Sequence, residues 1–290
     1  MFKGSYVALI TPFDGDNVDE DAFVKLVQWH IEQGTHGLVP VGTTGESPTL
    51  SHTEHKRVVE LTVKTVAGKI PVIAGAGSNN TRESIDFSIH AEQAGADALL
   101  HVAGYYNRPN QIGMYRHFEA VHNACNLPIV VYNIPPRCVV GLDVDTLTDL
   151  AKLPRIVGVK DATADLSRPG KERIRIQGEF SWLSGEDATA VAYNASGGQG
   201  CISVTANVAP AMCAAMQQAC LDGDYTKALD YQDKLMPLHE ALFTEPSPAG
   251  AKYAASLLGL CRDECRLPIV ELTDVTKRKI EDAMQRINLI

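Results

Sequence analysis

Two short apolar stretches, Ile129-Val130-Val131-Tyr132 and Ile156-Val157-Gly158-Val159-Lys160, decide the fold class. Their apolar residues are almost continuous, as in parallel strands that are buried on both faces, whereas strands with one face in solvent alternate apolar and polar residues. Six further stretches of this kind occur before and after them, at residues 6–10, 37–41, 71–74, 98–102, 180–184 and 201–204. The sequence therefore predicts eight parallel strands.

The segments between these strands carry the signals of helices. Ser51-His52-Thr53-Glu54 is a capping box, in which the serine and glutamate side chains bind free backbone amides at a helix start. An earlier stripe of apolar residues at helical spacing ends before Gly34. Asn80 and Glu83 predict a third helix start, and that helix is expected to close near Gly95.

Strands that alternate with helices are typical of either a closed barrel or an open doubly wound sheet. The number of strands favours the barrel, and the lack of a GxGxxG motif after the first strand disfavours a dinucleotide-binding sheet. The strand pattern stops near residue 208, and helices are predicted at residues 210–221, 225–242, 249–258 and 275–287. We therefore predict an α/β fold in which residues 1–223 form a (β/α)8 TIM barrel, the catalytic domain, and residues 224–290 a C-terminal helical region.

The composition excludes several classes of protein. A formal net charge of −9 gives the chain no general attraction to nucleic acid or to anionic lipid. No apolar stretch reaches the ~20 residues that a membrane span requires, and no signal peptide precedes the first strand. The seven cysteines lack metal-binding or CxxC spacing and are interpreted as reduced thiols. We therefore expect a cytoplasmic protein without nucleic-acid or membrane partners.

Lys160 is the strongest candidate for a catalytic residue. In a barrel of this type the functional groups come from the C-terminal ends of the strands, and Lys160 is predicted to be the last residue of the sixth strand. Burial there would lower the pKa of its ammonium group, and the free amine could attack a ketone to form an imine. The structural alternative is a lysine that extends past the strand end into water.

Three other loops after predicted strands carry groups that can bind or protonate a substrate. Residues 42–47, Gly-Thr-Thr-Gly-Glu-Ser, combine glycines with hydroxyl groups, and backbone amides in such a loop can bind a carboxylate or phosphate. Tyr105 and Tyr106 follow the fourth strand, and Tyr132 and Arg137 lie at the end of the fifth. A tyrosine can relay protons, and an arginine can hold a carboxylate through two hydrogen bonds. Each pattern also has a structural explanation: an ordinary turn, packed tyrosines or an arginine in solvent.

Five motifs occur in a specific order along the whole chain. They are Gly42-Thr43-Thr44-Gly45-Glu46-Ser47, Tyr105-Tyr106-Asn107-Arg108-Pro109, Tyr132-Asn133-Ile134-Pro135, Gly158-Val159-Lys160 and Ser203-Val204-Thr205-Ala206-Asn207. With these motifs the chain resembles the dihydrodipicolinate synthase and N-acetylneuraminate lyase family of class I aldolases. The resemblance implies that Lys160 forms the imine.

Within that family, Thr43-Thr44 and Arg137 resemble the dihydrodipicolinate synthase branch, which condenses pyruvate with L-aspartate 4-semialdehyde in the diaminopimelate route to lysine. The resemblance implies that no metal or organic cofactor is needed. It also implies that the backbone amides of Thr43 and Thr44 hold the pyruvate carboxylate, and that Arg137 holds the semialdehyde carboxylate. The remaining implied site residues are Tyr132, Thr44 and Tyr106 as a proton relay and Gly185 and Ile202 as backbone contacts.

Two further expectations come from the resemblance alone. Tyr106 would be supplied by a neighbouring subunit of a homotetramer built as a dimer of dimers. L-Lysine would inhibit the enzyme from a second, allosteric site. The positions that match this site are Ser47, His52, His55, Asn79, Glu83 and Tyr105.

The chain departs from the family pattern at a few positions. Ala103-Gly104 replaces the usual Thr-Pro before the tyrosine pair, which alters how Tyr105 and Tyr106 are presented. Cys138 stands where Thr or Ser is common, and we expect it to pack rather than react. Glu186 replaces a more usual Asp.

Three alternatives to the synthase remain. One is a lyase with the same imine chemistry that splits sialic acid or a 2-keto-3-deoxy sugar acid; Thr43 and Arg137 argue against it. Another is a phosphosugar isomerase, because Gly197-Gly198-Gln199-Gly200 lies where many barrels bind phosphate, although no Glu or His base stands at a strand end. The third is a catalytically inactive regulator.

Overall fold

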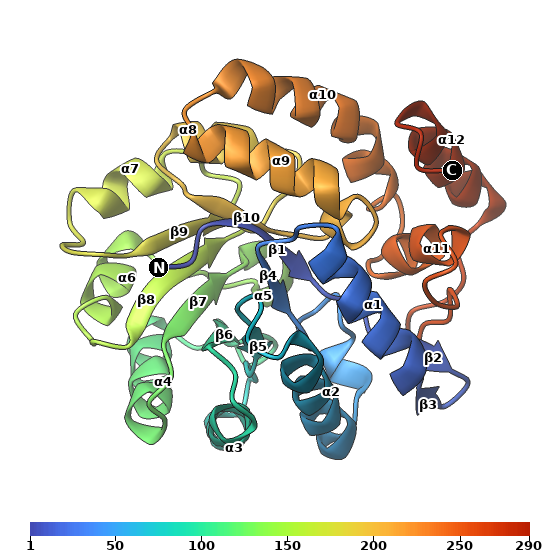
Figure 1. The fold of residues 1–290 in the computed structure, drawn as a ribbon. Coiled ribbons are helices and arrows are strands. Elements are labelled where there is room, and N and C mark those ends of the chain that lie inside the picture. The colour runs from blue at the N-terminus through green and yellow to red at the C-terminus, as the bar shows by residue number, and fades with distance from the viewer.

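Eight parallel strands form the barrel that the sequence predicts (Figure 1). The computed structural model describes residues 1–290. The barrel strands are β1 (Gly4–Ala8), β4 (Gly37–Val39), β5 (Ile73–Gly75), β6 (Ala98–Val102), β7 (Ile129–Asn133), β8 (Ile156–Asp161), β9 (Ser181–Ser184) and β10 (Gly200–Ser203). They are hydrogen-bonded in the order β4-β1-β10-β9-β8-β7-β6-β5, and an isolated parallel bridge from Leu38 to Val72 joins the two ends. The fold is therefore a (β/α)8 TIM barrel.

Helices connect successive strands around the outside of the barrel (Figure 1). The outer helices are α1 (Glu20–Glu32), α2 (His52–Val66), α3 (Thr81–Ala94), α4 (Gln111–Ala124), α6 (Val144–Leu150), α7 (Arg168–Arg173), α8 (Ala190–Ala195) and α9 (Pro210–Leu221). The capping box at Ser51 is confirmed, as are Asn80 as the N-cap of α3 and Gly95 as its left-handed C-cap. Glu83 does not bind back to Asn80; its carboxylate contacts His52 and Ser78 instead.

Most predicted strand ends were wrong by one or two residues, and two of these differences affect the site. Lys160 is not the last residue of β8, because Asp161 still pairs with both neighbouring strands. The strand predicted at residues 37–41 ends at Val39, and Val41 adopts a positive φ of 49° that no strand accommodates. The sequence patterns also missed five short elements, which are β2 (Phe13–Asp14), β3 (Asn17–Val18), α5 (Pro135–Cys138) and the 3-10 turns Ser47–Thr49 and Thr205–Asn207.

The apolar core has an inner and an outer part. Inside the barrel, side chains from the strands fill the space, as is usual for eight strands. This inner cluster contains Tyr6, Ala8, Val39, Ile73, Ala98, Leu100, Val130, Tyr132, Leu183 and Ile202. The larger outer cluster lies between the strands and the helices and includes Val7, Phe23 and Phe118. All seven cysteines are free thiols, and none of the helices is both long and apolar enough to cross a membrane.

Three further helices follow the barrel, close to the predicted ranges: α10 (Tyr225–Ala241), α11 (Ala249–Leu257) and α12 (Asp274–Arg286). Helix α10 packs on α9, and α12 packs on α10 and α11. Figure 1 places α11 beside α1 and the β2–β3 hairpin, so the C-terminal region lies against the first part of the chain. Ala228, Ala251 and Ile280 from these helices belong to the same outer core as the barrel helices.

Candidate active site

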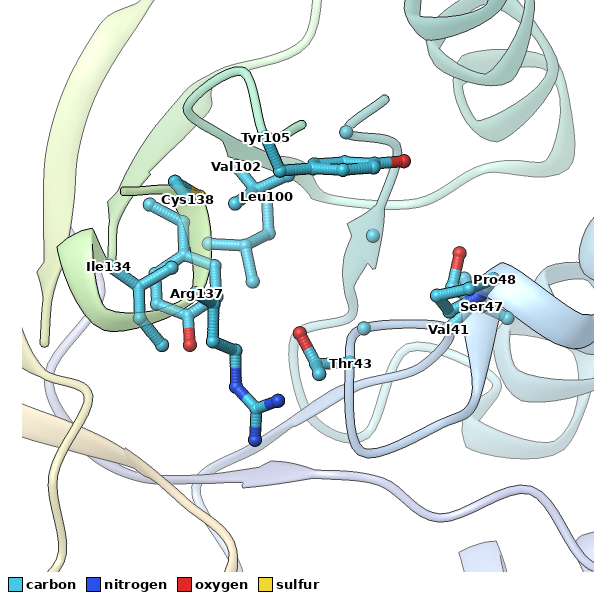
Figure 2. Close-up of a pocket in the computed structure, with 14 residues that line it drawn as sticks. Val41, Thr43, Ser47, Pro48, Leu100, Val102, Tyr105, Ile134, Arg137 and Cys138 are labelled. Atoms are coloured by element: carbon cyan, nitrogen blue, oxygen red, sulfur yellow. The ribbon is translucent and has the colours of Figure 1, made fainter. Parts of the chain in front are cut away.

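A cavity of about 230 Å³ opens at the C-terminal ends of the strands. Five of the residues that the sequence predicted for the active site or the effector site line this cavity. They come from the ends of three strands, β4, β6 and β7, or from the loops that follow them. They are Thr43, Ser47, Tyr105, Tyr132 and Arg137. Figure 2 shows the Arg137 guanidinium extending into the cavity on the same side as the Thr43 hydroxyl, with the Tyr105 ring at another wall. A concave apolar pocket with a few convergent polar groups at this end of a barrel is the typical position of an active site.

Lys160 lies next to this cavity, against the Tyr132 ring. Its Nζ is 4.2 Å from the ring centroid, and the residue is only 6% exposed. Burial lowers the pKa of the Lys160 ammonium to about 8, far below its ordinary value of 10.5. At pH 7 about a tenth of the Lys160 side chains are therefore the free, nucleophilic amine, far more than for a lysine with the ordinary pKa.

Gly185 lies against the same lysine, and Ile202 belongs to the inner cluster beside it. A Cβ atom on Gly185 would lie 3.1 Å from Lys160 Cε and 2.9 Å from the Ala162 Cβ, so only glycine leaves room for the lysine at this point. Ile202, on β10, is buried in the inner cluster with Tyr132. The structure thus brings Lys160, Tyr132, Gly185 and Ile202 together, although they come from four different strands or strand ends.

The lowered pKa leads to a prediction about pH. We expect the rate at which Lys160 forms an imine with a ketone to rise with pH, to reach half its maximum near pH 8 and to level off about one unit higher, where the amine is almost fully deprotonated. Borohydride trapping of the imine at a fixed, subsaturating ketone concentration measures this rate. A rate that continues to rise past pH 10 would show that Lys160 titrates like an exposed lysine and would contradict the prediction.

The Tyr132 hydroxyl can act as an acid or a hydrogen-bond donor. Burial raises the pKa of the phenol well above its ordinary value, so the hydroxyl stays protonated at neutral pH.

Asp187, a buried residue whose charge acts on Lys160, is one that the sequence patterns missed. Its carboxylate accepts hydrogen bonds from the Val204 and Thr205 amides at 2.9 and 3.2 Å, and its charge partly opposes the lowering of the Lys160 pKa.

The loop 42–47 has a strained backbone at both ends and begins where Val41 packs closely against Gly75. Val41 and Glu46, on either side of the threonine pair, both have positive φ, at 49° and 56°. Gly75 leaves space for this backbone, since a Cβ there would lie 2.5 Å from the Val41 carbonyl oxygen. Thr43 lines the cavity, whereas Thr44 is buried beside it and does not. Residues held in sparsely populated backbone conformations concentrate at functional sites, which supports the choice of this loop.

Arg137 is carried by the single turn α5, and this turn is anchored by Cys138. The buried Cys138 Sγ donates to the Ala103 carbonyl oxygen at 3.3 Å. Burial raises the pKa of the Cys138 thiol to about 11, so it stays protonated and unreactive. Cys138 therefore packs against Ala103, so that two of the residues that depart from the family pattern contact each other.

Tyr106 is not part of the cavity. Its side chain is 89% exposed, its φ is 66°, and only its neighbour Tyr105 lines the cavity. The loop is held by Asn107, whose side-chain amide donates to the Asn79 carbonyl oxygen at 2.8 Å, and by contact between Gly104 and Pro109. Within one chain the predicted proton relay is therefore incomplete.

Of the six residues predicted for an effector site, His52 and His55 lie on α2 and Glu83 on α3, whereas Ser47, Asn79 and Tyr105 lie in the loops next to these helices or at the cavity. His52 Nε2 is 2.7 Å from Glu83 Oε1, and Ser78 donates to the other oxygen of this carboxylate. His55 is buried and stacks on the Phe87 ring, with centroids 3.9 Å apart. Burial lowers the pKa of His55 to about 4, so it is neutral at pH 7. The structure thus brings His52 and Glu83 together, whereas Ser47 and Tyr105 line the cavity itself.

Comparison with known proteins gives a consistent result. A sequence model of the dihydrodipicolinate synthetase family matches residues 1–287. The 4-hydroxy-tetrahydrodipicolinate synthase of Parvibaculum lavamentivorans is 62% identical to this chain over 290 residues, with 100% of both chains covered. The chloride-inhibited dihydrodipicolinate synthase of Acinetobacter baumannii, solved in complex with pyruvate, is 40% identical, has a TM-score of 0.97 and is covered completely, as is this chain. The enzyme of Cyanidioschyzon merolae, solved with lysine bound, is 34% identical with a TM-score of 0.97, and 100% of this chain and 99% of that chain are covered.

Proposed function

Because the chain belongs to the dihydrodipicolinate synthetase family and is a lyase of the class I aldolase type, we propose that it is a 4-hydroxy-tetrahydrodipicolinate synthase. It would condense pyruvate with L-aspartate 4-semialdehyde in the diaminopimelate route to lysine. The observation that carries the proposal is the buried Lys160, whose lowered pKa suits it to imine formation. A relative with pyruvate bound and a relative of 62% identity with this activity in its name support the choice of substrate.

The first half of the reaction uses the Lys160 amine. Its nitrogen attacks the carbonyl carbon of pyruvate, and the carbonyl oxygen leaves as water after it has been protonated. The protonated imine withdraws electrons, so a proton leaves the methyl group and an enamine forms. Tyr132, whose phenol stays protonated and lies against the Lys160 side chain, is placed to pass these protons.

The second half forms the ring. The enamine carbon attacks the aldehyde carbon of the semialdehyde, and the aldehyde oxygen takes up a proton and becomes the ring hydroxyl. The amino group of the semialdehyde then attacks the imine carbon, which closes the ring and releases Lys160. The backbone amides of Thr43 and Thr44 would hold the pyruvate carboxylate, and Arg137, which extends into the cavity, would hold the carboxylate of the semialdehyde (Figure 2).

Tyr106 would complete the relay of Tyr132 and Thr44 from a neighbouring subunit. An aromatic side chain that is 89% exposed beside the cavity supports this arrangement, because a second copy of the chain would cover it.

We propose a homotetramer, built as a dimer of dimers. Within each chain, residues 1–223 would form the catalytic barrel and residues 224–290 a helical region. Free cysteine thiols fit a reducing compartment, and we propose that the enzyme acts in the cytoplasm.

The test is turnover of pyruvate with L-aspartate 4-semialdehyde, followed through a coupled reductase that consumes NADPH. The proposal requires turnover that depends on both substrates. Folded protein that forms the Lys160 imine with pyruvate but does not turn over this pair would be a different pyruvate lyase of the same chemistry, for sialic acid or a 2-keto-3-deoxy sugar acid.

Feedback inhibition by L-lysine is a further part of the proposal. The Glu83 carboxylate contacts His52 and Ser78, and it could pair with the ammonium group of lysine. We expect Glu83→Gln to raise the lysine concentration for half-inhibition by about tenfold or more and to leave turnover without lysine within about twofold. Arg82→Gln, a change of a neighbouring exposed charge on the same helix, is the matched control. Unchanged lysine sensitivity in Glu83→Gln would contradict this site.

A further inference from the structure

A buried ion pair joins the loop 42–47 to the C-terminal helices. Glu46 is 3% exposed and Lys252, on α11, is completely buried, and Lys252 Nζ lies 2.5 Å from Glu46 Oε1. The other carboxylate oxygen of Glu46 accepts a hydrogen bond from the Arg266 backbone amide at 2.9 Å. Removal of one partner from such a pair would leave a buried charge without compensation, so the two side chains hold each other in place.

The C-terminal segment also fixes the lysine from its other sides. Lys252 Nζ donates to the Glu264 carbonyl oxygen at 2.6 Å and lies 3.9 Å from the centroid of the Phe13 ring. The Arg266 guanidinium stacks on the same ring at 4.3 Å and donates to the Thr49 carbonyl oxygen at 2.9 Å. The loop that carries Glu46 is therefore connected at two points to residues far away in the chain.

Glu46 in turn determines the backbone of the threonine pair. Its φ of 56° is unfavourable for a residue with a side chain and persists only where the surroundings enforce it. Its amide donates to the Thr43 carbonyl oxygen at 3.1 Å, and the Ser47 amide donates to the Gly42 carbonyl oxygen at 3.3 Å. These turn bonds set the direction of the amides between them, at Thr43 and Thr44.

We propose that Lys252 is a positioning residue for substrate binding: through its ion pair with Glu46 it holds the backbone of Thr43 and Thr44 in the conformation that accepts the substrate carboxylate. The identity of that substrate as pyruvate rests on the proposed function. Neither Lys252 nor Glu46 touches the substrate, and neither transfers a proton. The C-terminal helical region thereby contributes to the active site of its own chain.

The experiment measures the pyruvate concentration at which half of Lys160 is trapped by borohydride, by mass spectrometry of the intact chain. Lys252→Met removes the charge and keeps most of the volume. We expect the half-saturating pyruvate concentration to rise by about tenfold or more while the fraction trapped at saturation stays close to wild type, because a misplaced loop weakens binding without removing the nucleophile. Lys279→Met, at an exposed position of α12, is the matched control and is expected to match wild type.

A second variant keeps the test valid if Lys252→Met folds poorly. Glu46→Gln combined with Lys252→Met leaves no unpaired buried charge and is expected to fold, yet to keep the raised half-saturating concentration. If either variant melts at a lower temperature but binds pyruvate as wild type does, the ion pair serves stability only and the inference is overturned. If wild-type protein traps no pyruvate, the proposed function is wrong, and the inference about Lys252 is wrong with it. The measurement on the wild-type protein therefore distinguishes a wrong function from a wrong role of the ion pair.

Discussion

Lys160→Ala is expected to abolish imine trapping by pyruvate and to lower turnover by about 10⁴-fold or more, because the reaction then loses its covalent nucleophile. The side chain is buried against Tyr132, which lines the cavity, and the residues that line the cavity include no lysine. Mass spectrometry after borohydride reduction shows the adduct directly, and the coupled assay gives the rate. An adduct that persists in Lys160→Ala would assign the imine to another lysine and contradict the central proposal.

Lys160→Met separates loss of chemistry from loss of structure, since methionine fills nearly the same space. The folded-state pKa of about 8 lies below the ordinary value of 10.5, so the folded protein resists the proton that the unfolded chain binds. Below pH 8 Lys160 is protonated in both the folded and the unfolded state. Burial of its ammonium group then lowers the free energy of unfolding by the full amount, about 3 kcal/mol. The penalty disappears as the pH rises from 8 to 10.5.

The inactive Lys160→Met variant should therefore melt at a higher temperature than wild type at pH 7, by several degrees, and this difference should shrink as the pH approaches 10.5. Thermal unfolding followed by circular dichroism at both pH values measures it. A lower melting temperature at pH 7 would show that burial of the ammonium carries no such cost.

Tyr132→Phe is expected to lower the rate at saturating substrate by about 10²–10³-fold, with a much smaller effect on the half-saturating pyruvate concentration. The phenylalanine keeps the ring beneath Lys160 Nζ and removes only the hydroxyl that we propose passes protons. Steady-state kinetics with both substrates give the two quantities separately, and single-turnover trapping shows that the imine still forms, more slowly.

Tyr6→Phe is the matched control for this change. Tyr6 is also a buried tyrosine of the inner cluster, with a phenol whose pKa burial raises, but it does not line the cavity. Its loss of a hydroxyl should leave turnover within about threefold of wild type. Equal losses in the two variants would mean that a buried phenol matters for packing, and would remove Tyr132 from the relay.

Local patterns in the sequence were sufficient where the physics is local. The strands show in apolar runs such as residues 129–132, and α2 and α3 begin at the predicted caps, because burial on both faces and capping of free amides constrain residue types within a few positions. The two-residue strands β2 and β3 are too short to produce a period. Val41 leaves its strand early for a reason outside its own segment, the close approach of Gly75.

The candidate site was only partly visible in the sequence. Lys160 near the end of an apolar strand, and the resemblance of the surrounding motifs, pointed to the candidate for the imine-forming residue and to the loops that line the cavity. The pairing of Glu46 with Lys252 left no local signal except a single charge within the otherwise apolar start of α11. The exposure of Tyr106 and the contact of Cys138 with Ala103 were equally absent from any local pattern.

The sequence by itself determined that this chain forms a (β/α)8 barrel with a lysine near the C-terminal end of its sixth strand, because the burial of a strand follows from the residue types within it, although its last residue does not. The tertiary structure decided how reactive that lysine is, since its pKa depends on how completely distant segments exclude water from it. It also decided which residues from separate loops face one cavity, and which buried charge from the C-terminal helices holds the threonine loop. Desolvation and ion pairing depend on distance in space, and residues far apart in the chain become neighbours only when the barrel closes.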